Sequence, residues 1–98
     1  MIRKTSFHRL ARQEFDEAEA HYSDIDRVLG RSFVRNFGFA LDLITQRPLA
    51  WALIDDHTRR KLVGKFPFAI YYTLICDDVY VLAVGHQNRM PFYWSGRR

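Results

Sequence analysis

The sequence predicts an α+β fold: an N-terminal strand, an antiparallel two-helix hairpin, and then a three-stranded antiparallel sheet. Two observations support this prediction. Apolar residues recur at helical spacing in the first half of the chain, and runs rich in β-branched and aromatic residues follow in the second half. A chain of 98 residues, 48% of them hydrophobic, can bury one modest core, so residues 1–98 are expected to form a single domain.

The first half of the chain has the pattern of one strand and two helices. Residues 2–7 are β-prone, and residues 9–23 place apolar side chains on one helical face, with the acidic residues facing elsewhere. Gly30 is expected to separate this helix from a second one, which Pro48 would end. A short link between two amphipathic helices predicts a hairpin. Its apolar faces consist of Ala11, Phe15, Ala18, Tyr22, Phe33, Phe37, Ala40, Leu41 and Ile44.

The second half of the chain has the pattern of a connector and three strands. Residues 49–58 form the connector, with Trp51 as its anchor, and residues 60–64 form the next strand. Two longer β-rich runs, at 68–76 and 79–86, are joined by Asp77-Asp78, which predicts a two-residue hairpin link. Cys76 falls within the first of these runs and is therefore expected to fill the core.

Charge and cysteine content narrow the functional classes. The net charge of +4 and the sequence pI of about 9.6 favour an anionic partner, either nucleic acid or an acidic protein. Cys76 is the only cysteine, so no internal disulfide can form, which fits a reducing cytoplasm. No apolar run approaches the roughly 20 residues of a membrane span, and no secretory signal is evident. We therefore expect a cytoplasmic protein that does not bind a membrane.

Three polar residues after the last predicted strand suit metal-free RNA cleavage. His86 titrates near neutral pH and can act as base or acid, Arg89 can hold the phosphate, and Tyr93 can donate a proton or stack on a base. The same residues also have ordinary structural roles, because strand-end histidines often cap backbone groups and aromatic pairs usually pack. The spacing alone leaves both interpretations open.

A second basic group, Arg59, Arg60 and Lys61, falls beside or on an expected strand. Because side chains alternate along a strand, Arg60 faces opposite to the other two. One side can meet phosphate or an acidic partner, or the charges serve only to keep a sheet edge from aggregating. The DDH loop at residues 55–57 lacks the ligand spacing of a metal site, and no cofactor-binding motif occurs, so neither a metal nor a cofactor is expected.

Several segments together carry a family resemblance. The main ones are RRKLVGKFPFAIYY at residues 59–72 and VLAVGHQNRMPFYWSGR at residues 81–97, preceded by residues 15–22, Leu29-Gly30 before Phe33, and Pro48 with Trp51. The combination FP-F-x-I-x-Y … V-x-A-V-x-H-x-x-R-x-P-x-Y-W is specific. On these motifs, nearly the whole chain resembles the RelE/ParE superfamily, the toxins of bacterial type II toxin–antitoxin systems.

The resemblance implies a small basic toxin that arrests growth until a cognate antitoxin covers it, and an assembly that is a toxin dimer or a toxin–antitoxin hetero-oligomer. RelE-like members cut messenger RNA in the ribosomal A site without metal, whereas ParE-like members poison DNA gyrase. Matched to the RelE pattern, the C-terminal tyrosine falls on Tyr93 and a strand lysine near Arg60. Two arginines of that pattern, however, fall on Ala69 and Gln87.

The two missing arginines favour the ParE-like branch. Losing one preorganised electrostatic contact typically costs a few kcal/mol of transition-state stabilisation, so losing two should be severe. We therefore expect DNA gyrase as the target, reached by protein binding. The residues expected to contact the target or antitoxin are Arg59, Arg60, Lys61, Trp94 and Arg97. The alternatives are an endoribonuclease of ribosome-bound mRNA that uses His86, Arg89 and Tyr93, and a toxin that has lost its activity.

Overall fold

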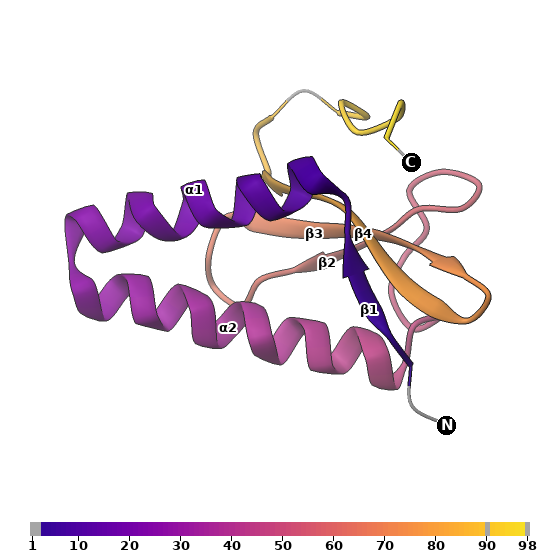
Figure 1. The fold of residues 1–98 in the computed structure, drawn as a ribbon, viewed down its shortest axis with the longest axis horizontal. Coiled ribbons are helices and arrows are strands. Elements are labelled where there is room, and N and C mark those ends of the chain that lie inside the picture. Colours follow the sequence, from indigo (N-terminus) through magenta and orange to yellow (C-terminus); the bar gives the residue numbers. More distant parts are fainter. Residues whose placement is uncertain (1–2, 90, 98) are drawn as a thin grey trace.

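The computed structural model describes residues 3–89 and 91–97 (Figure 1). Its elements follow the predicted order of β, α, α, β, β, β, and their bounds are β1 (Thr5–Phe7), α1 (Arg9–Ile25), α2 (Arg27–Gln46), β2 (Arg59–Leu62), β3 (Phe68–Ile75) and β4 (Asp78–His86). The predicted start of the first strand, Ile2, lies outside the described residues. Across the two described ranges, neither helix is both long enough and apolar enough to cross a membrane.

The four strands form one mixed sheet in the order β1-β4-β3-β2. Strands β2, β3 and β4 are antiparallel neighbours, as predicted. Strand β1, in contrast, pairs in parallel with β4, with Thr5 opposite Val79 and Phe7 opposite Val81. The sheet is therefore not purely antiparallel. Local sequence patterns could not predict this pairing, because the two strands lie at opposite ends of the chain (Figure 1).

The break between the helices lies at Asp26 and not at Gly30, which corrects the sequence prediction. Asp26 has an extended backbone, and its carboxylate accepts a hydrogen bond of 2.8 Å from Val28 N, so it caps the start of α2. Gly30 is buried within α2, where a Cβ atom would collide with Ser23 on α1. The glycine therefore allows the two helices to approach closely and does not form the link.

The turn between β3 and β4 consists of Cys76 and Asp77, one residue earlier than predicted. Both residues have positive φ, 50° and 69°, as a type I′ hairpin turn requires, and Ile75 pairs with Asp78 across it. Cys76 is exposed in this turn. The prediction that it fills the core is therefore wrong, because the strand ends before reaching it.

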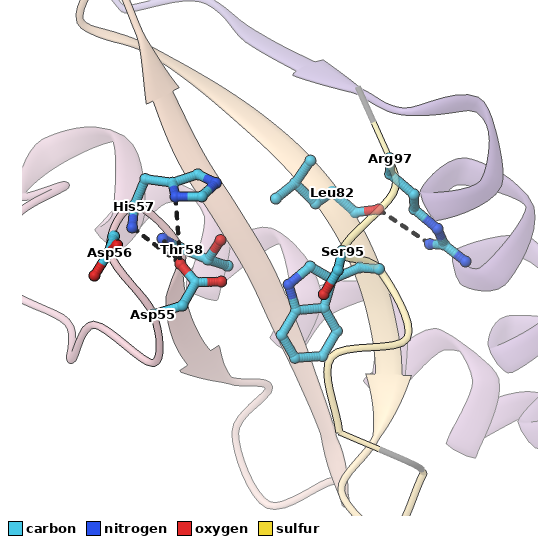
Figure 2. A pocket seen from close by; sticks show the side chains of 8 residues that line it. Asp55, Asp56, His57, Thr58, Leu82, Ser95 and Arg97 are labelled. Carbon is cyan, nitrogen blue, oxygen red and sulfur yellow. Dashed lines mark hydrogen bonds and ion pairs between the residues drawn. The ribbon is translucent and has the colours of Figure 1, made fainter.

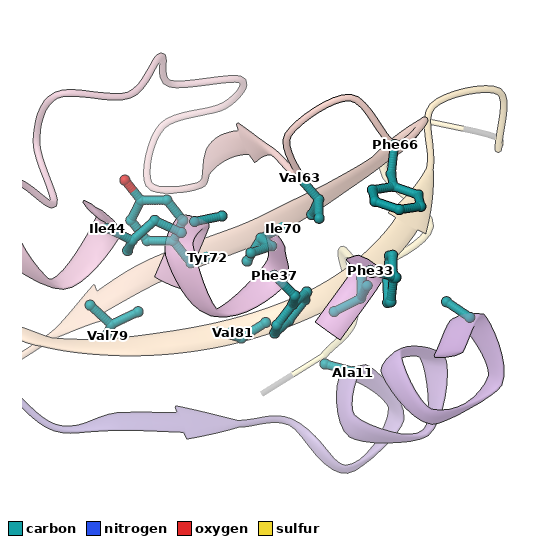
Figure 3. Packing of buried hydrophobic residues seen from close by; sticks show 13 residues of the cluster. Ala11, Phe33, Phe37, Ile44, Val63, Phe66, Ile70, Tyr72, Val79 and Val81 are labelled. Carbon is teal, nitrogen blue, oxygen red and sulfur yellow. The ribbon is translucent and has the colours of Figure 1, made fainter. Parts of the chain in front are cut away.

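The helix face of the sheet, which α1 and α2 cover, holds the main core (Figure 3). Phe33 and Ile44 are fully buried, and Phe37 is 4% exposed, which confirms the predicted apolar face of α2. Trp51, the predicted anchor of the connector, packs against this core. The core residues are Ala11, Ala18, Phe33, Phe37, Ala40, Ile44, Val63, Phe66, Ile70, Tyr72, Val79, Val81 and Val84.

The opposite face of the sheet, called here the second face, carries a smaller apolar cluster. Its buried members are Ala69, Tyr71, Leu82, Ala83 and Trp94, with Ile54, Tyr80 and Tyr93 packed around them. No helix covers this face. Instead, the 49–58 connector contributes Ile54, and the C-terminal segment, residues 91–97, contributes Tyr93 and Trp94. Of the residues predicted to carry function, Tyr93 and Trp94 lie in this cluster, and Arg60 lies on the same side of the sheet, opposite Tyr71.

Candidate functional site

Trp94 attaches the C-terminal segment to the second face. Its indole ring stacks on Tyr71 with 4.1 Å between ring centroids and 21° between ring planes, and only 3% of the residue is exposed. We expected Trp94 at a binding surface, but the structure places it in an apolar cluster. Its large ring stabilises the segment, and it offers little surface to a partner.

Glu14 on α1 holds the C-terminal segment from the other side. Its carboxylate accepts hydrogen bonds from Arg97 at 2.8 and 3.0 Å and from Arg89 at 3.0 Å. It also accepts a hydrogen bond of 3.1 Å from Val84 N on β4. The pairing of β1 with β4 ends at Val81, so β1 does not reach this backbone group. Glu14 was predicted to face away from the apolar side of α1, yet only 10% of its side chain is exposed. The carboxylate replaces a missing strand partner and forms ion pairs with two arginines, which share its single negative charge.

Arg97 links the C-terminal segment to both α1 and β4. Besides its bonds to Glu14, its guanidinium donates to Leu82 O at 3.0 Å, and 10% of its side chain is exposed. The hydrogen bond to Glu14 is the main reason that the pKa of Arg97 is raised above its ordinary value, although burial opposes this. Arg97 was expected to contact a target, but its charge is already paired within the protein.

Tyr93 lies beneath the two arginines. The Arg89 guanidinium is 3.8 Å from the ring centroid, and the hydroxyl is buried without a hydrogen-bond partner among the described residues. A Cβ atom at Gly85 would collide with this hydroxyl, so the glycine provides the space for the phenol. Burial, and next the charge of Glu14, raise the pKa of Tyr93 well above its ordinary value. A phenol held this way is poorly placed to exchange a proton with a substrate.

His86 ends β4 and is exposed. Its Nδ1 accepts a hydrogen bond of 3.1 Å from Asn88 N, so the neutral ring carries its proton on Nε2. In this tautomer Nε2 carries the proton and is a donor. To accept a proton at Nε2, the ring would first have to move its own proton to Nδ1, and it would then lose the hydrogen bond from Asn88 N. The ring also contacts the edge of Phe68, with 5.5 Å between centroids. The structure therefore gives His86 the capping role considered from the sequence.

The predicted catalytic residues do not share one cavity. His86 lines a groove between α1 and β4, together with Glu17 and His21. Arg89 lines this groove together with His86, and it also lines a second groove on the other side of the C-terminal segment, whereas Tyr93 lines neither. A substrate bound in the first groove could therefore contact His86 and Arg89, but neither groove brings all three predicted groups together.

The basic residues 59–61 separate as alternation along a strand predicted. Arg59 donates to Leu49 O and Trp51 O, and the Lys61 ammonium lies 4.3 Å from the Trp51 ring centroid, so both secure the connector. Arg60 is exposed on the other side. It lines the second groove, here called the Arg60 groove, whose volume is about 210 Å³. The lining residues are Ile54, Arg60, Tyr71, Gln87, Arg89, Pro91, Phe92 and Trp94.

The two positions that lack the arginines of the RelE pattern differ in environment. Ala69 is fully buried in the second-face cluster, opposite Gly85 on β4. An arginine there would have to displace the aromatic side chains that cover it. Gln87 is exposed and lines the Arg60 groove. The groove therefore has two cationic side chains, one of which, Arg89, forms an ion pair with Glu14.

A further pocket of about 250 Å³ lies between the 55–58 loop and the C-terminal segment (Figure 2). The Asp55 carboxylate accepts hydrogen bonds from the backbone N of His57 at 2.9 Å and of Thr58 at 2.7 Å. Burial alone would raise the pKa of Asp55, but these hydrogen bonds outweigh it and lower the pKa. The loop is thus folded by its own aspartate. In the described ranges, no group of three or more His, Cys, Asp or Glu residues is placed to hold a metal ion.

Comparison with solved structures identifies the fold. The chain is similar to a chain described as "Chromosomal ParDE TA system from P. aeruginosa", with a TM-score of 0.73 and 13% sequence identity. The match covers 87% of this chain and 96% of that chain. The protein therefore has a ParE-like α+β fold, as its sequence resemblance implied. No family model matches the sequence, and neither does any curated protein.

Proposed function

We propose that this protein is the toxin of a type II toxin–antitoxin system and acts by binding a protein target. The ParE-like fold supports the class, because the similar solved chain belongs to a ParDE toxin–antitoxin system. The net charge of +4 supports an anionic or acidic partner. In this proposal a cognate antitoxin covers the toxin in the cytoplasm, and DNA gyrase is the target.

The separation of the predicted catalytic residues is the observation that favours binding over RNA cleavage. Metal-free cleavage needs a proton acceptor, a proton donor and fixed positive charge around one phosphate. Here the His86 ring is in one groove, the Tyr93 hydroxyl is buried, and the positive charge of Arg89 is paired with Glu14. A protein interface requires none of these alignments, and exposed arginine and aromatic side chains are residue types that dominate interfaces.

The Arg60 groove is the surface we assign to the target or antitoxin. Arg60 and Phe92 are among its exposed members, and Phe92 is 48% exposed. Arg60 offers a cation without an ion pair among the described residues, and Phe92 offers an apolar ring of which one side contacts Trp94. Trp94 and Arg97, which the sequence placed in this role, are better described as supports beneath the surface.

Induced expression with two readouts tests the proposal. We expect the parent to arrest growth with gyrase-linked DNA breaks and without codon-positioned cuts in translated mRNA. Arg60→Glu and Phe92→Ala should relieve toxicity while circular dichroism shows an intact fold, and His86→Gln should remain toxic. A parent that cuts mRNA, and an intact His86→Gln variant that does not, would establish the nuclease alternative.

A further inference from the structure

The Arg60 groove combines positive charge with apolar surface. Five of its lining side chains are apolar or aromatic, two are arginines, and none of the described residues that line it is acidic. Two neighbouring sites differ in this respect, because Glu14 and Glu17 line the groove between α1 and β4, and Asp55 and Asp56 line the pocket beside the 55–58 loop. The Arg60 groove is therefore suited to an anion that also carries an apolar group.

The two arginines of the groove supply a net positive charge. Arg60 is exposed on β2, where it lies opposite Tyr71, and it forms no ion pair with any described residue. Arg89 forms an ion pair with Glu14, but Arg97 uses the same carboxylate, so these three residues together keep one positive charge. A guanidinium binds a carboxylate through two parallel hydrogen bonds. Arg60 is thus well suited to hold an incoming carboxylate.

Phe92 provides the apolar part of the groove and is held in place before any partner binds. Its φ of 64° lies in the left-handed region, which is uncommon for a bulky residue. Its carbonyl oxygen accepts hydrogen bonds from Ser95 N at 3.0 Å and from Ser95 Oγ at 2.7 Å, and these stabilise the conformation. The ring centroid lies 5.5 Å from that of Trp94. An uncommon conformation retained at an exposed aromatic residue indicates a role in binding, since a ring already in position loses less entropy when a partner binds.

We infer that the Arg60 groove binds the C-terminal residue of a partner protein, with the α-carboxylate at Arg60 and an aromatic or large aliphatic side chain against Phe92. The inference rests on the proposed function, because it specifies the chemistry of the partner at the groove assigned there. The groove volume of about 210 Å³ is below the roughly 300–1,000 Å³ of pockets for drug-sized ligands, so it suits about one residue.

The geometry of an extended chain favours a terminus over an internal acidic residue. Adjacent side chains of an extended segment point to opposite sides, and side chains two residues apart are separated by about 7 Å. An internal carboxylate and a neighbouring apolar side chain would therefore not enter the same small groove. A C-terminal residue carries its carboxylate and its side chain on one Cα atom, so both can enter together.

A nucleic acid matches the groove less well. Its affinity for proteins comes largely from several cations that contact successive phosphates. The groove offers Arg60 and a second arginine, Arg89, that is already paired with Glu14. Most of its remaining lining is apolar or aromatic, which matches the side chain of a protein terminus.

An NMR titration with short peptides provides the test. The probe is an unlabelled Gly-Ser peptide of about six residues that ends in phenylalanine with a free carboxylate, added to the ¹⁵N-labelled protein. We expect shifts in the backbone amides of Arg60, Gln87 and Phe92, which all line the groove. The same peptide with a C-terminal carboxamide, and a peptide acid that ends in glycine, should each bind at least about tenfold more weakly.

Three variants separate the two halves of the groove. Arg60→Gln should weaken binding of the acid peptide at least about tenfold and leave the weak binding of the carboxamide peptide within about twofold. Phe92→Gly should weaken binding of the acid peptide while circular dichroism stays unchanged, because glycine readily adopts a positive φ. Arg35→Gln is the control, since Arg35 is exposed on α2 beyond the helix face, and it should leave binding within about twofold.

The inference is wrong if the carboxamide peptide binds as tightly as the acid, or if Arg60→Gln and Arg35→Gln have equal effects. It is also wrong if inorganic phosphate or a single-stranded RNA hexamer shifts the same amides at lower concentration than the peptide does. Growth arrest on induced expression is measured separately. A toxic protein that does not bind the acid peptide contradicts only this inference, whereas a non-toxic protein that binds it contradicts only the proposed function.

Discussion

The two faces of the sheet are held by different interactions. On the helix face, aromatic and aliphatic side chains from α1, α2 and the sheet form a continuous apolar core, and Phe15, Phe33 and Phe37 contact one another. On the second face, four buried residues of the sheet are covered by a short C-terminal segment that contributes the buried Trp94 and that an ion-pair network around Glu14 holds in place. The helix face is stabilised by many apolar contacts, whereas the second face depends on a smaller apolar cluster and on the ion pairs of Glu14.

This difference explains why charged side chains are needed to hold the C-terminal segment on the second face. Arginine, glutamate and tyrosine are unusual choices for cores, yet here they secure a segment that has too few residues to form an apolar core of its own. Polar side chains near a strand end therefore look catalytic in the sequence while serving structure. Substitutions on the two faces should separate these roles.

The largest effect is expected on the helix face. Phe37→Ala should lower the free energy of unfolding by about 3–5 kcal/mol, because it leaves a cavity among packed aromatic rings. Urea denaturation followed by circular dichroism measures this loss. Phe39→Ala, two residues along the same helix but exposed, should change stability by less than about 0.5 kcal/mol. Equal effects of the two variants would contradict the assigned orientation of α2.

A smaller effect is expected for Trp94→Ala on the second face. The loss should be about 2–4 kcal/mol, because the C-terminal segment can shift to fill part of the space. In the Trp94→Ala variant, amide hydrogen exchange in residues 91–97 should be faster than in the parent, whereas exchange in α2 should change less. The reason is that the C-terminal segment detaches before the whole chain unfolds. Phe92→Ala is the control, because this ring is 48% exposed, against 3% for Trp94, and its removal should cost less. Unchanged exchange in the segment would show that Trp94 does not attach it.

Glu14→Gln tests the ion-pair network and should cost about 1–3 kcal/mol. The amide keeps the shape and can still accept from Val84 N, but Arg89 and Arg97 lose their carboxylate. Thermal unfolding measures the change, and Glu17→Gln should be almost neutral, because Glu17, one turn nearer the end of α1, accepts a hydrogen bond from Gln13 on the helix surface. A neutral Glu14→Gln variant would mean that aromatic packing alone holds the second face.

The smallest expected effect lies at the hairpin turn, away from both clusters. Cys76→Asn combined with Asp77→Gly places the preferred residues at two positions of positive φ. We expect a gain of about 0.5–1 kcal/mol, measured as a rise in urea midpoint with an unchanged slope. The reversed order, Cys76→Gly with Asp77→Asn, should gain less. A loss of stability in both would contradict the turn assignment.

Periodicity predicted the helix face well and the second face poorly. The spacing of Phe33, Phe37 and Ile44 identifies a buried helical side without knowledge of the rest of the fold. Glu14 could not be predicted in this way, because Arg89 and Arg97 lie 75 and 83 residues further along the chain. The same limit applies to the β1–β4 pairing. The burial of Glu14 becomes evident only from its contacts with these distant arginines.

The Tyr93 environment has a weak signal in the sequence. Gly85 interrupts the otherwise apolar β4, and a glycine within a strand often marks the close approach of another group. In the structure that group is the Tyr93 hydroxyl. A glycine within β4, followed eight residues later by a tyrosine, therefore indicates that the tyrosine packs against the strand, rather than that it is catalytic.

The interior position of β4 also has a consequence for the newly made chain. During synthesis α1 and α2 can form from local contacts, but the strand that lies between β1 and β3 is the last of the elements to emerge. Until it inserts, the apolar sides of both helices lack most of the sheet that will cover them, and β1 has no neighbour. A ribosome that stalls shortly before Asp78 would therefore hold an incomplete sheet and an uncovered core, an intermediate prone to aggregation. The protein acquires its folded surface, and with it any ability to bind a partner through that surface, only after β4 has been made.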